Sequence, residues 1–173
     1  MRVLTFWKAI TVDKENALES LIALLETHGI HYCLIGGQAV NAYVEPLVSL
    51  DLDLVVAIDQ LEQVEMLLAE SFEVKRFPHS LNVSLPQSDI RVQIQTDRRY
   101  ASFPERATPR RVLGLTLPVA SLEDVLQGKI WAVLDPDQRG SKRQKDLADI
   151  ARLLEAFPEL RPRTPLEVLN HLI

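Results

Sequence analysis

A glycine pair between two apolar runs constrains the fold of this chain more than any other feature. Residues 30–35 form a short apolar run that is typical of a strand, and the run ends at Gly36 and Gly37. Residues 38–43 then predict a short helix that stops before Pro46, because proline cannot continue a helix. The chain therefore passes from a strand through a tight turn directly into a helix.

The next predicted strand, residues 49–58, carries two carboxylates. Leu52 and Leu54 share one face of this strand, and Asp51 and Asp53 share the other. Carboxylates at i and i+2 can hold Mg²⁺ without any loop rearrangement, because this ion prefers hard oxygen ligands. Two like charges side by side also require a cation or a basic residue nearby. The alternative is two solvated acids on an exposed strand face.

The glycine pair adds an anion site to this pattern. Gly36 and Gly37 let backbone N–H groups approach a phosphate, and the helix that starts at Gln38 offers unsatisfied donors and a positive dipole end. The alternative is a turn selected only for packing. Taken together with the downstream carboxylates, the glycine turn predicts a metal–nucleotide site.

The rest of the chain predicts a mixed sheet with helices packed against it, an α+β fold with a helical C-terminal part. Asp13 caps the first helix and Gly29 stops it, while Ser121 caps a later one. We expect a single domain, residues 1–173, with the sheet core at about 13–100 and the helical part at about 121–173. The predicted helices are 13–28, 61–69, 122–134 and 142–157, the strands are 80–85 and 90–95 with a weaker one at 72–76, and an irregular stretch runs through Pro104 and Pro109.

Composition restricts the function classes. A 47% hydrophobic content fits a globular core, and no apolar run reaches the ~20 residues of a membrane span. The N-terminus has no signal-peptide pattern, so we expect a cytoplasmic protein with no membrane partner. The net charge of −5 argues against a general nucleic-acid coat, although residues 98–173 are mildly basic. Cys33 falls in an apolar run and is expected to be a buried hydrophobe.

The combined pattern resembles the DNA polymerase beta-like nucleotidyltransferase superfamily. The resemblance lies in LIGGQA at residues 34–39, followed by SLDLDL at residues 49–54. A later KDLADI at residues 145–150, with a lysine in the preceding helix at Lys129, looks most like the nucleotidyltransferases of abortive-infection toxin–antitoxin systems. The resemblance spans about residues 15–157.

The resemblance implies a nucleotidyltransferase that binds Mg²⁺ or Mn²⁺ with an NTP substrate. It implies transfer of NMP to a hydroxyl of RNA or protein, with a toxin or antitoxin partner. The residues it implicates are Asp51 and Asp53 as metal ligands and catalytic residues, Lys129 as a further catalytic residue, and Gly36, Gly37 and Gln38 at the nucleotide. We expect Lys129 on the same side of the sheet as the two aspartates, the alternative being a lysine that snorkels at the edge of the apolar stripe.

Two positions depart from the pattern of the superfamily. Leu47 stands where an arginine is common, and Gln93 stands where the third carboxylate is usual, although Asp89 and Asp97 lie at the ends of that strand. A neutral amide cannot act as a general base, so we expect Gln93 beside the aspartates and a weak catalyst. A catalytically weak or inactive module that binds nucleotide or protein therefore remains an alternative, as does an unrelated α/β interaction domain.

Other charged residues are expected to be structural. We interpret Asp149 as an ordinary helical partner of Lys145 or Arg152, and Asp146 is ambiguous. The arginines of the connecting segments are expected to be solvated loop charges, the alternative being contact with phosphate or RNA: Arg98, Arg99, Arg106, Arg110 and Arg111.

Overall fold

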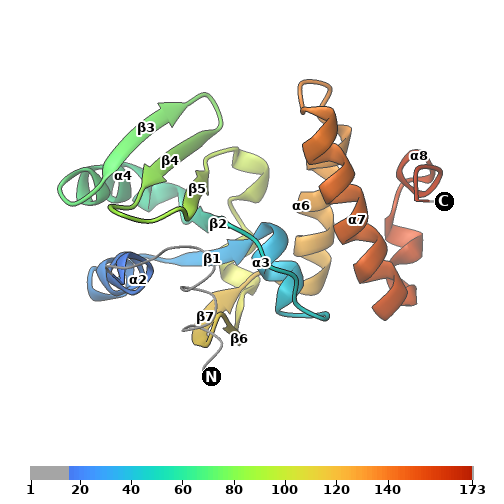
Figure 1. Cartoon of the computed structure of the whole chain (residues 1–173), viewed down its shortest axis with the longest axis horizontal. Coiled ribbons are helices and arrows are strands. Elements are labelled where there is room, and N and C mark those ends of the chain that lie inside the picture. Colours follow the sequence, from blue (N-terminus) through green and yellow to red (C-terminus); the bar gives the residue numbers. More distant parts are fainter. Residues whose placement is uncertain (1–15, 173) are drawn as a thin grey trace.

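A mixed sheet forms the centre of the protein (Figure 1). The computed structural model describes residues 16–172, which contain a 7-stranded sheet in the order β3-β4-β5-β2-β1-β7-β6. The central pairs combine both directions, since β1 runs antiparallel to β2 while β2 runs parallel to β5. The strands are β1 (Tyr32–Ile35), β2 (Asp51–Val56), β3 (Glu73–Phe77), β4 (Ser80–Ser84), β5 (Arg91–Gln95), β6 (Thr108–Val112) and β7 (Leu115–Val119). The predicted mixed sheet is confirmed.

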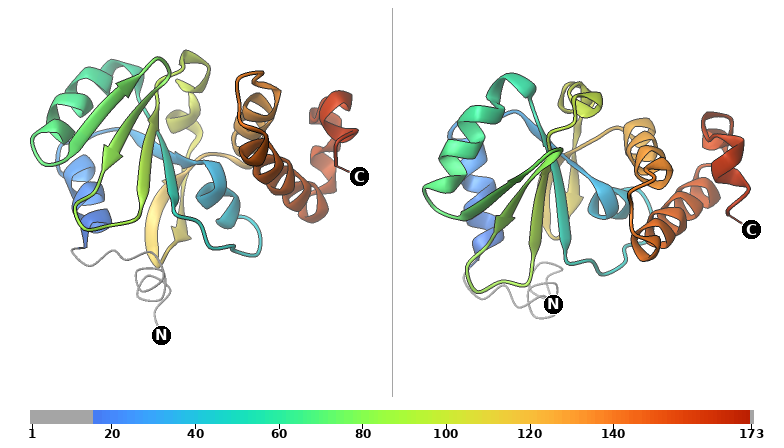
Figure 2. Two further views of the ribbon diagram at one scale, coloured as in Figure 1. Left: turned by 45° about the horizontal axis from the view of Figure 1, so that its top comes forward. Right: turned by 90° about the horizontal axis from the view of Figure 1, so that it is seen from above.

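Helices cover both faces of the sheet (Figure 2). α2 and α4 lie on one face, and α3, α6 and α7 lie on the other. The principal helices are α2 (Ala17–Thr27), α3 (Gly36–Asn41), α4 (Leu61–Ala69), α6 (Leu122–Leu134) and α7 (Gly140–Ala156). Short α5 (Phe103–Arg106) and α8 (Leu166–Leu169) and the 3₁₀ turns η1 (Ile58–Gln60), η2 (Arg98–Tyr100) and η3 (Pro158–Arg163) complete the described chain.

Local sequence signals set the buried face and the C-terminal end of α2. Its apolar residues at helical spacing, Leu18 and Leu21 among them, are fully buried against the sheet. The helix ends at a left-handed Gly29 with φ +63°, and the Ile30 N–H donates to the Leu25 carbonyl at 2.9 Å. This six-to-one bond is the Schellman arrangement, which satisfies a terminal carbonyl. The predicted N-cap at Asp13 lies outside the described residues.

The sheet extends past the expected limit at about residue 100. The sequence predicted an irregular stretch there, but β6 and β7 form a hairpin at the edge of the sheet. Proline is tolerated in edge strands, and Pro109 lies in the edge strand β6, opposite Pro118 of β7. The turn is Leu113-Gly114, with φ +56° and +79°, so a leucine occupies a position that usually takes asparagine or glycine.

The C-terminal helices follow the prediction closely. The Ser121 hydroxyl accepts a hydrogen bond from the Asp124 backbone N–H at 3.2 Å, which caps α6 at the predicted position. α7 starts at Gly140 rather than at residue 142, and it buries Leu147, Ile150 and Leu153. No helix within residues 16–172 is both long enough and apolar enough to span a bilayer.

Candidate active site

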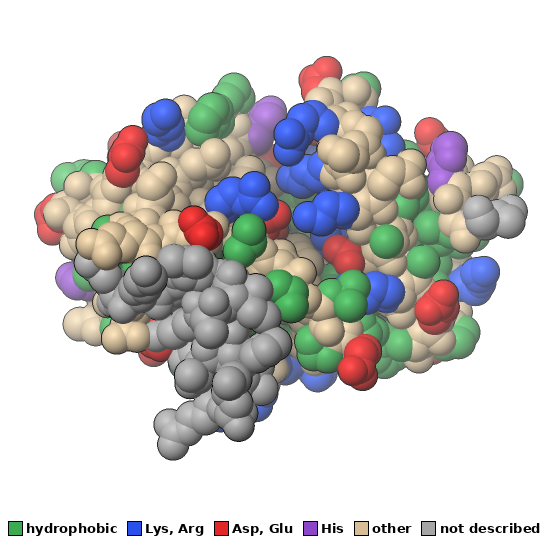
Figure 3. All heavy atoms as spheres, in the orientation of Figure 1, with side chains coloured by type: hydrophobic (Ala, Val, Ile, Leu, Met, Phe, Trp, Pro, Cys, Tyr) green, Lys and Arg blue, Asp and Glu red, His purple; other side chains and the backbone are tan. Residues whose placement is uncertain are grey.

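A cleft of about 690 Å³ lies between the sheet and the C-terminal helices. β2, β4 and β5 supply one wall, and α6 and α7 supply the other. Figure 3 shows Lys and Arg side chains gathered along this hollow. The cleft brings Asp51, Asp53, Gln93 and Lys129 together, although they come from three different elements.

The parallel register of β2 and β5 places the predicted neighbours side by side. Asp53 is opposite Gln93, and Asp51 is opposite Arg91. All four line the cleft, so their side chains share one face of the sheet, while Leu52 and Val92 are buried on the other face. The prediction that Gln93 lies on the strand next to the aspartates and on their face is confirmed. A neutral amide therefore stands beside Asp53.

The glycine turn is fitted to the Asp53 carboxylate. Gly36 has φ +70°, a left-handed backbone that favours glycine. A Cβ at this position would overlap the carboxylate of Asp53 and would lie 3.0 Å from both its Cβ and its Cγ. A Cβ at Gly37 would meet only the Asp149 carboxylate, at 3.7 Å. The close approach of backbone to carboxylate therefore requires glycine at position 36 but not at position 37.

Asp53 is a carboxylate without a protein partner. Within the described residues it has neither a hydrogen bond nor an ion pair on its carboxylate. Burial raises the pKa of Asp53 to about 6, although Lys129 and Lys142 oppose this increase. A half-buried carboxylate in this state attracts a cation.

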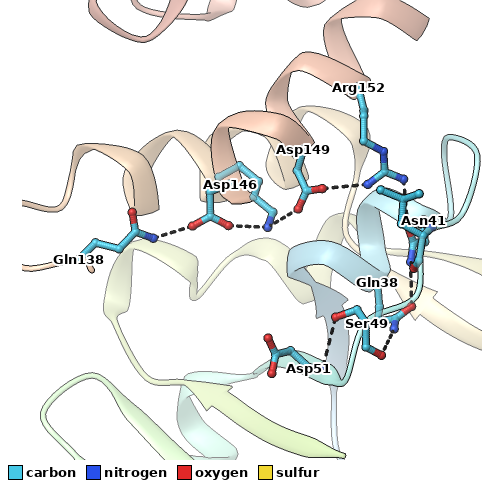
Figure 4. Close-up of polar contacts among 10 residues, drawn as sticks. Gln38, Asn41, Ser49, Asp51, Gln138, Asp146, Asp149 and Arg152 are labelled. Carbon is cyan, nitrogen blue, oxygen red and sulfur yellow. Dashed lines mark hydrogen bonds and ion pairs between the residues drawn. The ribbon is translucent and has the colours of Figure 1, made fainter. Parts of the chain in front are cut away.

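Lys129 is buried and carries its charge into the cleft. Its Nζ lies 2.7 Å from Asp146 and 2.8 Å from Asp149, both on α7 (Figure 4). Burial alone would lower the pKa of Lys129, but the two carboxylates hold it above the ordinary value. Lys129 is therefore an ammonium on the same side of the sheet as Asp51 and Asp53, as predicted, and not a snorkelling lysine.

Two acids of α7, Asp146 and Asp149, line the cleft, although the sequence analysis interpreted Asp149 as an ordinary helical partner and left Asp146 ambiguous. Asp149 does form the expected i, i+3 pair with Arg152, at 2.8 Å, but it also pairs with Lys129 and lines the cleft. Asp146 accepts a further hydrogen bond from Gln138 at 2.5 Å and is almost fully buried. Both acids are therefore part of the site. Only the packing of α7 on α6 reveals this placement, since each spacing alone indicates surface pairing.

Three basic residues that the sequence analysis did not identify also line the cleft. Arg139, Lys142 and Lys145 recur at i, i+3 and i+6, so they follow one face of the N-terminal part of α7. Within the described residues none of the three side chains is paired with an acid. Their helical spacing was the signal that could have identified them. The opposite wall contributes Arg91 of β5.

Gln38 supports the loop between α3 and β2 rather than lining the cleft. Its side chain is 1% exposed and donates to the Ser49 carbonyl at 3.2 Å (Figure 4). Asn41 bonds both the backbone N–H and the carbonyl of Leu47, which fixes the same loop. Of the predicted nucleotide contacts, Gly37 lines the main cleft and Gly36 lines a smaller adjoining cavity of about 80 Å³.

The two acids at the ends of β5 have different positions. Asp89 lines the cleft, whereas Asp97 caps η2 and pairs with Arg99 at 3.0 Å. Arg106 was expected to be a solvated loop charge, but its Nε pairs with the nearly buried Asp124 at 2.8 Å. Cys33 is buried as predicted, and burial raises the pKa of its thiol to about 12.

The carboxylates of Asp51 and Asp53 fit a hard divalent cation. Asp51 and Asp53 supply carboxylate oxygens from one face of β2, and the Gly36 turn leaves room for the second of them. Within the part of the chain that the structure describes, no group of three or more His, Cys, Asp or Glu side chains could hold a metal. A cation at Asp51 and Asp53 would therefore have two carboxylate ligands from the described residues.

The fold and the site define a protein of the nucleotidyltransferase class. A mixed sheet carries a glycine turn and, on the next strand, the paired aspartates. Residues 23–171 match the family described as the nucleotidyl transferase AbiEii toxin of type IV toxin–antitoxin systems. The chain belongs to this family. No curated protein matches the chain.

Solved structures show the same fold. The antibiotic-resistance factor ANT(2'')-Ia aligns with a TM-score of 0.58 and 13% identity, over 90% of this chain and 94% of its own. An antigenic nucleotidyltransferase-like protein from Paracoccidioides brasiliensis aligns with a TM-score of 0.52 and 22% identity, over 91% and 86%. The lincosamide antibiotic adenylyltransferase LnuA aligns with a TM-score of 0.51 and 14% identity, over 81% and 98%.

Proposed function

We propose that this protein binds a Mg²⁺–NTP complex in the cleft and transfers NMP to a hydroxyl of RNA or of a protein, within a toxin–antitoxin system. The observation that carries the proposal is the placement of Asp53. Its unpartnered carboxylate touches the Gly36 turn on one side and faces the charged Lys129 across the cleft. Family membership supports the reaction class.

The charged side chains have separate roles in this proposal. Asp51 and Asp53 would hold the metal, which, when bound, gathers negative charge on the phosphates and stabilises the leaving group. Lys129 is fixed by two carboxylates, so it offers a positioned charge rather than a mobile one. Arg139, Lys142 and Lys145 line the opposite wall, where they neutralise the triphosphate.

The transfer step needs a group that accepts a proton. The acceptor oxygen forms a bond to the α-phosphorus, the bond between that phosphorus and the bridging oxygen breaks, and pyrophosphate leaves. The hydroxyl proton cannot pass to Gln93, because a neutral amide is not a base, and it therefore leaves to water. General-base assistance is typically worth ~10²–10⁴-fold, so we expect the wild-type protein to be slow.

A second function has one specific observation in its favour. Gln93 occupies the place beside Asp53 where a carboxylate would complete the site, so the protein can be a nucleotide-binding module without turnover. Binding without transfer would support this candidate over the first.

The first test measures nucleotide binding by thermal unfolding. At a hundredfold excess over its dissociation constant, Mg²⁺–NTP should stabilise the fold by about 2.7 kcal/mol. The double variant Asp51→Asn, Asp53→Asn should lose this gain, because it cannot hold the metal. An unchanged melting temperature of the wild type with all four NTPs at millimolar concentration would refute the site.

The second test measures turnover. Wild type and Gln93→Asp are incubated with α-labelled NTPs and with cellular RNA and protein, and the transferred label is counted. We expect Gln93→Asp to transfer more label than wild type. Fast wild-type transfer that Gln93→Asp does not increase would show that another carboxylate is the base, and Asp89, which lines the cleft, would then be tested.

A further inference from the structure

Arg91 occupies the metal side of the cleft and pairs with one of the proposed metal ligands. It is the first residue of β5 and lies opposite Asp51 in the parallel register. Its Nε is 2.8 Å from the Asp51 carboxylate. The Arg91 backbone N–H donates to the Leu50 carbonyl at 2.9 Å, which fixes the base of the side chain beside β2. A guanidinium therefore sits where a divalent cation would approach Asp51.

The cleft face of β5 is consequently positive rather than negative. Arg91 and Gln93 both point into the cleft, so this strand contributes one cation and one neutral amide next to the two aspartates. Arg139, Lys142 and Lys145 face them from α7. A divalent cation entering alone would meet this cationic wall and would have to displace Arg91 from Asp51.

The ion pair is built to be displaced. The Arg91 side chain is 68% exposed and that of Asp51 is 38% exposed, so water screens the attraction between them. Such a pair contributes little to stability and opens at little cost. A guanidinium is also the side chain that best matches a phosphate, because its planar fork donates two parallel hydrogen bonds.

We infer that Arg91 is a counter-ion that keeps free divalent metal off Asp51 and moves to the triphosphate when metal and nucleotide bind together. The site then accepts its metal as the metal–nucleotide complex and not as the bare ion. This inference rests on the proposed function. It assigns Arg91 as a nucleotide-binding residue beside the two carboxylates that β2 contributes to the cleft.

The test uses calorimetric titration of the full chain. Mn²⁺ alone is titrated first, and Mn²⁺ premixed with ATP, GTP, CTP or UTP is titrated second. The variants are Arg91→Gln and the matched control Arg76→Gln, which removes another exposed strand arginine from an ion pair, with Glu65, outside the cleft. Thermal unfolding of each variant without ligand confirms that it is folded.

The two affinities should move in opposite directions in Arg91→Gln. Removing a screened counter-ion should strengthen binding of Mn²⁺ alone by up to about fivefold. Losing a charge-assisted phosphate contact should weaken binding of the Mn²⁺–NTP complex by about tenfold or more. Arg91→Lys keeps the charge but loses the fork, so it should leave Mn²⁺ binding weak and recover only part of the nucleotide affinity. Arg76→Gln should change neither affinity.

Contrary outcomes separate the inference from the proposed function. If Mn²⁺–NTP binds the wild type but Arg91→Gln shifts both affinities in the same direction, or shifts neither, the inference is overturned and the proposed function stands. If the wild type binds no Mn²⁺–NTP complex of any of the four nucleotides, both are overturned.

Discussion

Replacing Gly36 by alanine tests whether the glycine turn and the Asp53 carboxylate form one site. Two other glycines provide matched controls. Gly29 has nearly the same left-handed backbone, with φ +63° against +70°, but a Cβ there meets nothing within 4 Å. Gly37 has no left-handed backbone and a Cβ there meets only Asp149, at 3.7 Å. The three substitutions therefore separate backbone strain from the collision with Asp53.

The expected loss of stability differs among the three substitutions because they combine backbone strain and steric overlap differently. A left-handed alanine costs about 1–2 kcal/mol, which Gly29→Ala and Gly36→Ala should share. Gly36→Ala must in addition displace Asp53, and overpacking of this kind typically costs about 1–3 kcal/mol. We expect total losses of about 1–2 kcal/mol for Gly29→Ala and about 2–5 kcal/mol for Gly36→Ala. Gly37→Ala should be close to neutral.

The assay is urea unfolding followed by thermal unfolding, each with EDTA and with excess Mg²⁺–NTP. Stabilisation of about 2.7 kcal/mol corresponds to a shift of roughly 5–11 °C for a chain of this size. Gly29→Ala and Gly37→Ala should keep this shift, whereas Gly36→Ala should lose most of it because Asp53 has moved. The reasoning fails if Gly36→Ala retains the full shift, or if Gly29→Ala is as destabilising as Gly36→Ala.

Three further predictions follow from groups under electrostatic or backbone strain. Because the folded pKa of Asp53 is about 6 against an ordinary 3.8, the wild type should lose stability as the pH rises between these values. In EDTA above pH 7, Asp53→Asn should therefore be more stable by up to about 3 kcal/mol, and the gain should vanish below pH 4; a variant no more stable than wild type in urea contradicts this. Lys129→Met should cost about 3–5 kcal/mol in urea unfolding at neutral pH, because it leaves Asp146 and Asp149 without their shared cation, and a loss below 1 kcal/mol would count against it. Leu113→Asn should change stability by less than about 1 kcal/mol, since the better tolerance of asparagine for the left-handed turn offsets the lost packing of Leu113 against the core; thermal unfolding measures this, and a loss of about 2 kcal/mol or more would contradict it.

The parts of the site that lie close together in sequence could be predicted. Asp51 and Asp53 share a strand face because strand side chains alternate, and this rule needs no tertiary information. The same rule oriented Gln93, and the position of Lys129 beside an apolar stripe oriented its ammonium. The structure places all four of these side chains on the cleft, in agreement with the predicted orientations.

The parts that depend on packing could not be predicted. Asp146 and Asp149 have the spacing of ordinary surface pairs, and only the contact of α7 with α6 brings them to Lys129. The ion pair of Arg91 with Asp51 depends on the register of β5 against β2, which no local pattern specifies. The β6–β7 hairpin was missed because its two prolines disfavour strands and its turn has a leucine where asparagine or glycine is usual. Pro109 is tolerated because β6 is the edge strand of the sheet.

Arg152 joins one end of α7 to the sheet side of the cleft. It bonds Asp149 on its own helix, and it also bonds the Asn41 side chain and the Glu45 carbonyl, which precede β2. At the other end of α7, within residues 16–172, no hydrogen bond or ion pair joins Arg139 or Lys142 to the sheet. The N-terminal end of α7 is instead held to α6, through the bonds from Arg143 to the Val133 and Asp135 carbonyls. The cationic end of the helix is therefore joined to the sheet side of the cleft less directly than the Arg152 end.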